Sequence, residues 1–317
     1  MLALPPDTEY AMRLVRLAVL LGMVAFLSGP AWSGEPASAR ALRKVDALLV
    51  ADREHAAAAA KTDMLTGVSA QFADSVVMPA GSKGLAEGRD AVIDALRARS
   101  GIATSRVTWA PVGVGMSADG GQGYTYGFMQ QTLADGSEVP LKYLAYWQRQ
   151  GTDWRVIAYR LARRAAGDVD RDLRHVLSPK DVPMTPGNAS SRDDAAATLA
   201  DAERAFSQEA QRLGLEAAFA KFGRSDSMNM GGGDAADFVH GAATIAKAVS
   251  VGQPAGGSTL HWGPERVVVA DSGDLGVSIG YIRHNAPDAD GKPLPPIPFF
   301  TVWHRAGPDE AWRYVAE

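Results

Sequence analysis

Residues 151–160 read GTDWRVIAYR, and residues 309–317 read DEAWRYVAE. The shared Trp-Arg pairs, Trp154-Arg155 and Trp312-Arg313, lie 158 residues apart, which is about half of the 317-residue chain. A single matching dipeptide arises by chance. If the chain contains a duplicated domain, however, further anchor residues should recur at nearly the same offset.

The second half of the chain repeats several anchors of the first half in order. The paired positions, with their offsets, are Asp52 and Asp201 (149), Glu54 and Glu203 (149), Gln71-Phe72 and Lys221-Phe222 (150), Asp74-Ser75 and Asp226-Ser227 (152), Trp109 and Trp262 (153), Gly127 and Gly280 (153), and Trp147 and Trp303 (156). The offset only grows along the chain, as expected when homologous elements are separated by slightly longer loops. We infer two copies of one domain.

Each copy predicts the same order of elements. A long helix is expected at 37–61 and at 192–213 because apolar residues recur there at helical spacing. A short second helix follows, with Asp63 as its N-cap in copy one, then a short strand and a third helix after Gly88 or Gly241. Four strands complete each copy, at 105–117, 122–133, 138–150 and 153–161, and at 258–271, 274–286, 296–306 and 311–317. This order predicts an α+β domain.

The copies define the expected domain boundaries. Residues 37–161 form copy one and residues 192–317 form copy two, while the polar, Pro- and Gly-containing stretch 162–191 is interpreted as a linker.

The pattern resembles the nuclear transport factor 2-like superfamily, in its SnoaL-like or ketosteroid-isomerase-like branch. The closest stretches are YWQRQGTDWRV in copy one and VWHRAGPDEAWRY in copy two. The resemblance implies two tandem cone-shaped domains. In each, three N-terminal helices and a curved, mainly antiparallel sheet surround an apolar pocket. The branch contains both enzymes and binding domains, so the fold alone leaves the function open.

Residues 1–33 are expected to be a signal peptide. Arg13 and Arg16 precede the apolar run 17–27, and small residues follow it. Cleavage is expected between Ser33 and Ala39, and the run is short for a membrane span. The expected location is therefore the periplasm or the medium, since the Ala-rich composition resembles that of bacterial proteins.

The composition excludes several classes of site. The chain has no cysteine, which rules out disulfides and thiolate metal sites. Net charge is −4 without a basic stripe, so we expect no nucleic-acid partner. Four histidines of copy two, His240, His261, His284 and His304, are not closely spaced, and we interpret them as part of a solvated face. We expect no metal and no cofactor.

Catalytic residues are not assigned by the sequence. In the isomerase branch a carboxylic acid performs proton transfer, but the matching positions around 79–81 and 231–233 carry no carboxylate. The sequence therefore favours binding over catalysis.

Aromatic and neighbouring residues are the best candidates for a ligand pocket. In copy one they are Met78, Trp109, Tyr124, Tyr126, Lys142 and Tyr143, and in copy two they are Met230, Trp262, Tyr281 and Phe299. Copy one, with more tyrosines on its strands, is the preferred binding half.

The strand segments YLAYW (143–147) and FFTVW (299–303) are apolar on both faces. A sheet with one solvated face should alternate between apolar and polar residues, so both faces are expected to be covered. We predict that the two copies cover each other's outer faces, as an intramolecular pseudo-dimer.

The sequence thus predicts a tandem SnoaL-like protein that binds a small apolar or amphipathic molecule. The alternatives are a ketosteroid-isomerase-like or polyketide-cyclase-like enzyme, and a structural or interaction module whose pockets are closed.

Overall fold

The computed structural model describes residues 37–99, 101–177, 189–254 and 256–317. The stretch from Pro36 to Glu317 forms one compact unit. The expected signal peptide, 1–33, lies outside the described residues. Of the helices that are described, none is long and apolar enough to cross a membrane.

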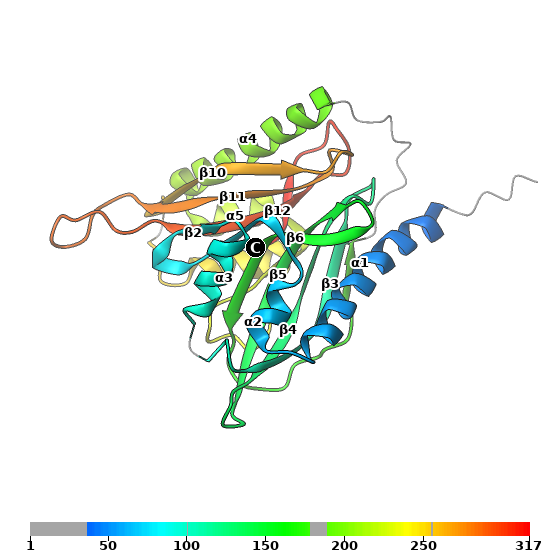
Figure 1. The fold of residues 1–317 in the computed structure, drawn as a ribbon. Helices are drawn as coiled ribbons and strands as arrows, with labels where there is room; N and C mark the ends of the chain where they lie inside the picture. Colours follow the sequence, from blue (N-terminus) through cyan, green and yellow to red (C-terminus); the bar gives the residue numbers. More distant parts are fainter. Residues whose placement is uncertain (1–36, 100, 178–188, 255) are drawn as a thin grey trace, which may run out of the picture. The chain divides into compact units, whose positions relative to one another are not determined.

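Copy one contains the three expected α-helices and the five expected strands, together with one short strand, β2, that was not expected (Figure 1). Its elements are α1 (Ala37–Ala59), α2 (Met64–Ser69), β1 (Phe72–Pro79), the 3-10 turn η1 (Gly81–Lys83), β2 (Leu85–Glu87), α3 (Arg89–Arg97), β3 (Arg106–Met116), β4 (Gln122–Thr132), β5 (Glu138–Gln150) and β6 (Asp153–Arg163).

Copy two repeats these elements. They are α4 (Ala189–Leu213), α5 (Leu215–Phe222), β8 (Gly223–Asn229), β9 (Val239–His240), α6 (Ala242–Ser250), β10 (Leu260–Val269), β11 (Leu275–His284), β12 (Ile297–His304) and β13 (Arg313–Ala316).

The two sheets have the same strand order. In copy one it is β2-β1-β6-β5-β4-β3, and in copy two β9-β8-β13-β12-β11-β10. Among these strands, neighbours are antiparallel except for β1 with β6 in copy one and the equivalent β8 with β13 in copy two, which are parallel. The predicted α+β fold in two tandem copies is therefore confirmed. The repeated Trp-Arg phrase occupies the equivalent strands β6 and β13, although Trp312 directly precedes β13.

Local chemistry explains where the short helices begin. The side chain of Asp63 accepts a hydrogen bond from the backbone N–H of Thr66 at 2.9 Å, which caps α2 as expected. Gly88 and Gly241 precede α3 and α6 with φ of 86° and 84°. This left-handed backbone region strongly favours glycine, so both third helices start at the predicted residue.

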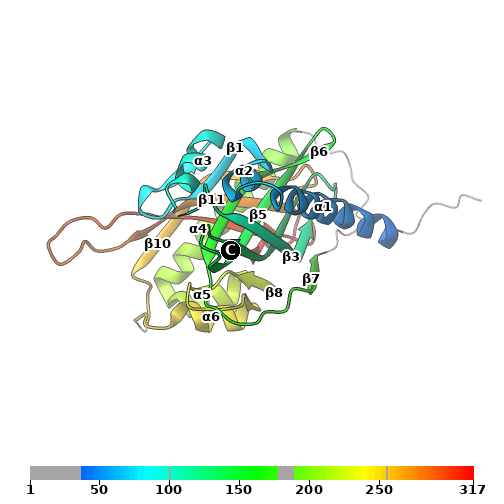
Figure 2. The ribbon, with the colours of Figure 1, turned by 60° about the horizontal axis from the view of Figure 1, so that its bottom comes forward.

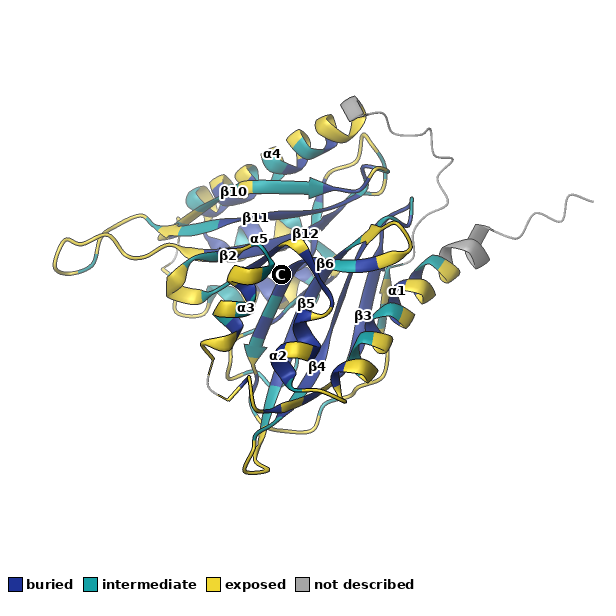
Figure 3. Cartoon of the chain, in the orientation of Figure 1, coloured by how far each residue is buried: buried dark blue, intermediate teal, exposed yellow. Residues whose placement is uncertain are grey.

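The long helices cover one face of each sheet. Figures 1 and 2 show α1 lying across the strands of copy one, where it packs on β3, and α4 packs on β10 in copy two. The outer side of α1 is exposed, while the strands beneath are buried (Figure 3). Val45, Leu48 and Leu49 supply the buried side of α1. The interior of each copy therefore lies between its long helix and its sheet.

The expected linker contains an additional strand. Residues His175–Leu177 form β7, which pairs in parallel with Gly113–Gly115 of β3 and extends the sheet of copy one. The stretch 162–191, interpreted as a linker from its sequence, thus includes one short strand. A three-residue strand rich in polar neighbours lacks the alternation that would reveal it in the sequence.

The outer faces of the two sheets pack on each other. One continuous cluster of buried residues joins Tyr126, Phe128 and Leu144 of copy one to Phe300 and Val302 of copy two. The turns at the sheet ends exchange hydrogen bonds. The backbone N–H of Ala118 donates to Asp274, and that of Ser272 donates to Asp119, each at 3.0 Å.

Candidate functional site

A cavity of about 230 Å³ lies inside copy two, between its helices and its sheet. Most of its lining is apolar: Phe206 of α4, Leu215 and Phe219 of α5, Val249 of α6, Leu260 and Trp262 of β10, Ile282 of β11, and Phe299 and Phe300 of β12. Its polar groups are few, namely Arg160, Glu203, Asn229, Thr301 and Glu317. An apolar hollow with a few convergent polar groups is the usual form of a small-molecule site.

Glu203 of α4 is a fully buried carboxylate at one side of this cavity. Its Oε1 accepts a hydrogen bond from Trp262 Nε1 at 2.7 Å. Its Oε2 accepts from Trp303 Nε1 at 2.8 Å and from the hydroxyl of Ser278. An indole N–H can only donate, so each oxygen has to act as an acceptor.

Burial raises the pKa of Glu203, and the three hydrogen bonds partly oppose that rise by favouring the charged form. The same hydrogen bonds occupy both oxygens. Abstracting a substrate proton would require Glu203 to give up one of these donors. The arrangement therefore suits a fixed acceptor better than a mobile general base.

Asp52 of α1 occupies the corresponding place in copy one. It is fully buried and accepts hydrogen bonds from Trp109 Nε1 at 2.6 Å and from the hydroxyl of Tyr143 at 2.8 Å. Burial raises its pKa as well. Because Trp109 and Trp262 are the shared partners, the structure equates Asp52 with Glu203, an offset of 151 residues. The sequence pairing of Asp52 with Asp201 is thus wrong by two residues.

The recurrence of this carboxylate in both copies indicates a structural role. In each copy a buried acid of the long helix, α1 or α4, accepts a hydrogen bond from a tryptophan of the first long strand, β3 or β10. This hydrogen bond fixes the helix on the sheet. The acid could have been recognised in the sequence, because Glu203 interrupts the apolar stripe of Leu199, Phe206 and Ala210 along α4.

A second polar group lies elsewhere in the lining of the cavity. Glu317 follows β13, and its Oε1 accepts a hydrogen bond from Asn229 Nδ2 at 2.7 Å. Burial raises the pKa of Glu317 to about 7, while the hydrogen bond from Asn229 and the charge of Arg160 act in the opposite direction. Near neutral pH this acid is therefore present in both protonation states.

Arg160 reaches the cavity of copy two from β6 of copy one. It is partly buried, and burial lowers its pKa, an effect that the charge of Glu317 opposes. Within the described part of the chain, its guanidinium makes no hydrogen bond or ion pair to another residue. The cavity is thus completed by a cation from the other copy.

The ten pocket candidates separate into three groups. Trp262 and Phe299 line the cavity of copy two. Met78, Trp109 and Tyr143 are buried in the core of copy one. The remaining five, Tyr124, Tyr126, Lys142, Met230 and Tyr281, lie on the side facing the other copy, where Tyr281 accepts a hydrogen bond from the backbone N–H of Leu85.

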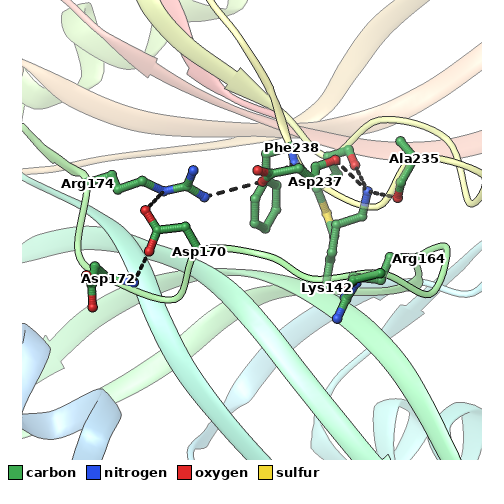
Figure 4. Close-up of polar contacts among 10 residues, drawn as sticks. Lys142, Arg164, Asp170, Asp172, Arg174, Ala235, Asp237 and Phe238 are labelled. Atoms are coloured by element: carbon green, nitrogen blue, oxygen red, sulfur yellow. Dashed lines mark hydrogen bonds and ion pairs between the residues drawn. The ribbon is translucent and has the colours of Figure 1, made fainter.

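These five lie outside the cavity of copy two, although Tyr124 and Tyr126 line a smaller hollow of about 200 Å³ beside Arg174 and His175. Adjacent residues on a strand face opposite ways, so Lys142 and Tyr143 cannot share an interior. The Lys142 ammonium donates to the backbone carbonyls of Met230, Ala235 and Asp237 in copy two, the last two at 3.1 and 3.2 Å (Figure 4). The ammonium therefore binds copy one to copy two, and it does not line the cavity of copy two.

The histidines of copy two are also less uniform than expected. His304 is buried, and His240 stacks on His175 of β7 with ring centroids 4.2 Å apart. His240 lies where copy one covers the sheet, and His304 lies beside Arg224 of its own copy, so the interpretation as a solvated face is wrong for them. Among the described residues, no group of three or more acidic or histidine side chains is arranged to hold a metal ion.

Comparison with known proteins gives matches only among solved structures. No protein-family model and no curated protein matches the chain. An NTF2-like protein with a cystatin-like fold from Novosphingobium aromaticivorans matches at 15% identity and a TM-score of 0.32, over 41% of this chain and 87% of that one. A ketosteroid isomerase-like protein from Erwinia carotovora matches at 16% identity and a TM-score of 0.31, over 39% and 97%. An NTF2-like protein from Shewanella oneidensis matches at 8% identity and a TM-score of 0.30, over 37% and 96%. Each of these three matches spans roughly two fifths of this chain.

Proposed function

We propose that the chain is a binding protein whose copy two holds a small, mostly apolar molecule in the cavity between α4 and its sheet. The observation that carries this proposal is the cavity itself, about 230 Å³ in volume and lined mainly by aromatic and aliphatic side chains. Copy two, and not copy one, is the binding half in this proposal.

The size of the cavity limits the ligand. A dry apolar cavity of about 150 Å³ is sufficient for benzene. A volume of about 230 Å³ therefore suits a molecule of about ten non-hydrogen atoms, such as a substituted aromatic ring or a short branched acyl chain. Burying such a molecule removes its apolar surface and that of the partly exposed Phe219 and Trp262 from water, which is the main driving force for binding.

A proton-transfer enzyme of isomerase or cyclase type is the second candidate, and Glu317 is the observation that favours it. An acid with a pKa of about 7 beside an apolar hollow is suited to give and take protons near neutral pH. Binding remains the preferred function because the other acid of the cavity, Glu203, is occupied by three hydrogen-bond donors.

We further propose that the protein acts outside the cytoplasm, in the periplasm or the medium. The support is the basic and then apolar pattern of residues 13–27, followed by small residues. Mass determination of the mature protein after expression with its own N-terminus would test this. An intact N-terminus on a cytoplasmic protein would contradict it.

Filling the cavity tests the binding function. Val249 lines the cavity, whereas Val251, two residues further on, is 79% exposed. We expect native mass spectrometry to detect a retained small molecule, or a bound aromatic probe, in the wild type and in Val251→Phe. We expect Val249→Phe to lose it, because the added ring occupies the ligand's volume. Equal retention by the two variants would contradict the proposal.

A further inference from the structure

We propose that Arg160 makes the cavity of copy two selective for an anionic ligand, a small carboxylate with an apolar body. This inference rests on the proposed binding function and adds the chemical class of the ligand. In this proposal the charged end of the ligand is bound by Arg160 of copy one, while the rest of the cavity belongs to copy two.

The first argument is that the guanidinium of Arg160 has no hydrogen-bond partner among the described residues. A guanidinium presents five N–H donors, and one removed from water is normally paired with a carboxylate or with carbonyl oxygens. Two other buried or partly buried arginines of this chain follow that rule: Arg164 donates to the carbonyls of Ala165 and Gly167, each at 3.0 Å, and Arg305 donates to the carbonyl of Gly273 at 2.6 Å. In the described part of the chain Arg160 has no such partner, although it lines an apolar cavity.

The second argument is geometric complementarity. The planar fork of a guanidinium matches the two oxygens of a carboxylate, which can form two parallel hydrogen bonds. The rest of the lining offers mainly apolar surface, with Phe299 and Trp262 among its aromatic members. A ligand with one charged end and an apolar body would therefore satisfy both the donors and the hollow.

Glu317 determines when this site is available. The charged groups that face it are Arg160 of β6 and Glu203 of α4, and Tyr314 of β13 lies near it as a neutral phenol. When Glu317 is ionised, it partly neutralises Arg160 and repels a carboxylate. When Glu317 is protonated, it leaves the positive charge of Arg160 for the ligand. Binding of an anion should therefore be accompanied by uptake of a proton.

The test compares two probes of nearly equal shape, phenylacetate and neutral phenylacetamide, by isothermal titration calorimetry. We expect wild-type protein to bind phenylacetate about ten- to a hundredfold more tightly than phenylacetamide, since charge-assisted hydrogen bonds are lost with the amide. Arg160→Gln should abolish this preference and leave the affinity for phenylacetamide within about twofold. Arg163→Gln is the matched control, because Arg163 lies on the same strand, is exposed, and carries the same charge.

The pH dependence provides an independent readout. Between pH 8 and pH 6 phenylacetate remains ionised, so its affinity should rise as Glu317 becomes protonated. The affinity of phenylacetamide should not change in this way. Glu317→Gln should remove the rise for phenylacetate while keeping tight binding at pH 8.

The outcomes separate the two proposals. If neither probe binds wild type, and Val249→Phe alters no retained ligand, the proposed binding function fails. If both probes bind wild type with equal affinity, or if Arg160→Gln keeps the preference for the anion, the cavity binds ligands but the role of Arg160 is overturned. Loss of the preference in Arg163→Gln as well would assign it to overall charge and would also overturn the inference.

Discussion

A carboxylate in the interior of an apolar domain is stable only when its oxygens are hydrogen-bonded. Asp52 and Glu203 meet this condition with different partners. In both copies a tryptophan of the first long strand donates to the carboxylate, Trp109 to Asp52 and Trp262 to Glu203. The other donor to Asp52 is the Tyr143 hydroxyl. The other donors to Glu203 are the Ser278 hydroxyl and the Trp303 indole. The residue type and its partners differ between the copies, but the acceptor on the long helix is retained. This supports a role in fixing the helix on the sheet.

Replacing Glu203 by Gln should therefore destabilise the protein. The indoles of Trp262 and Trp303 donate to different oxygens of the Glu203 carboxylate. A glutamine side chain has an acceptor oxygen at only one of these two places and an NH₂ donor at the other. One indole N–H is then left buried without a partner, which costs about 1–3 kcal/mol. Removing the charge recovers part of the desolvation cost that raises the pKa of Glu203. We expect a net loss of about 1–2 kcal/mol in the free energy of unfolding, measured by urea titration.

The exposed Glu216 of α5 provides the control, since Glu216→Gln should change stability by less than about 0.5 kcal/mol. An increase in stability on replacing Glu203 would have a different meaning. It would show that the carboxylate is kept at a cost to the fold, as functional groups often are.

At the scale of single elements, two cross-strand pairs of glycine with tyrosine, at non-equivalent positions of the two copies, meet different surroundings. Gly113 of β3 pairs with Tyr126, and Gly263 of β10 pairs with Tyr281. A Cβ atom built on Gly113 would lie 2.1 Å from the Tyr126 ring, whereas one built on Gly263 meets nothing within 4 Å. The Tyr126 ring is buried in the interface between the copies, where its centroid lies 5.0 Å from that of the Phe238 ring.

This difference predicts opposite results for two identical substitutions. Gly113→Ala should lower the free energy of unfolding by about 1–3 kcal/mol, because the buried Tyr126 ring has to move out of a close-packed interface. Gly263→Ala should be neutral or slightly stabilising, because alanine reduces the entropy of the unfolded chain. Chemical denaturation of both variants measures the contrast. Equal effects of the two substitutions would show that the packing of Tyr126 is looser than the structure indicates.

The elements themselves were largely predictable from the sequence. Local signals in the sequence marked most of them, and each signal was found where the sequence placed it. These signals are the helical spacing of apolar residues, the N-cap Asp63, and the glycines before the third helices, Gly88 and Gly241. Strand β7 was not predictable, because its pairing with β3 depends on a contact far away along the chain.

The candidate site was much less predictable, for a physical reason. Aromatic residues on strands can be recognised, but the face they occupy depends on register, and Tyr124 and Tyr126 turned out to face the other copy. Arg160 could not be found from the sequence at all. Its position at the cavity follows from the packing of one copy on the other, which no local pattern encodes.

At the scale of the whole molecule, the interface between the copies has the character of a domain core. Its apolar cluster includes Phe128, Leu144 and Phe300, all fully buried, and its polar contacts include the Lys142 ammonium. Burial lowers the pKa of Lys142 to about 8, while the charge of Asp237 opposes the shift. Neither copy could unfold alone without exposing the apolar outer face of the other. We infer that the two copies form a single cooperative unit.

Calorimetry can test this inference, because the unfolding enthalpy reports the size of the cooperative unit. At about 0.7 kcal/mol per residue, a unit extending from Pro36 to Glu317, roughly 280 residues, should unfold with about 200 kcal/mol, and one copy alone with about half of that. We expect one thermal transition whose van't Hoff enthalpy equals the calorimetric value. Lys142→Met should lower the transition temperature and leave a single peak, because it removes three hydrogen bonds at the interface and keeps the apolar cluster intact. Two separate peaks in the wild type, each with a van't Hoff enthalpy near 100 kcal/mol, would contradict the single unit. They would also weaken the role proposed for Arg160, whose place in the cavity requires that the copies stay packed at working temperature.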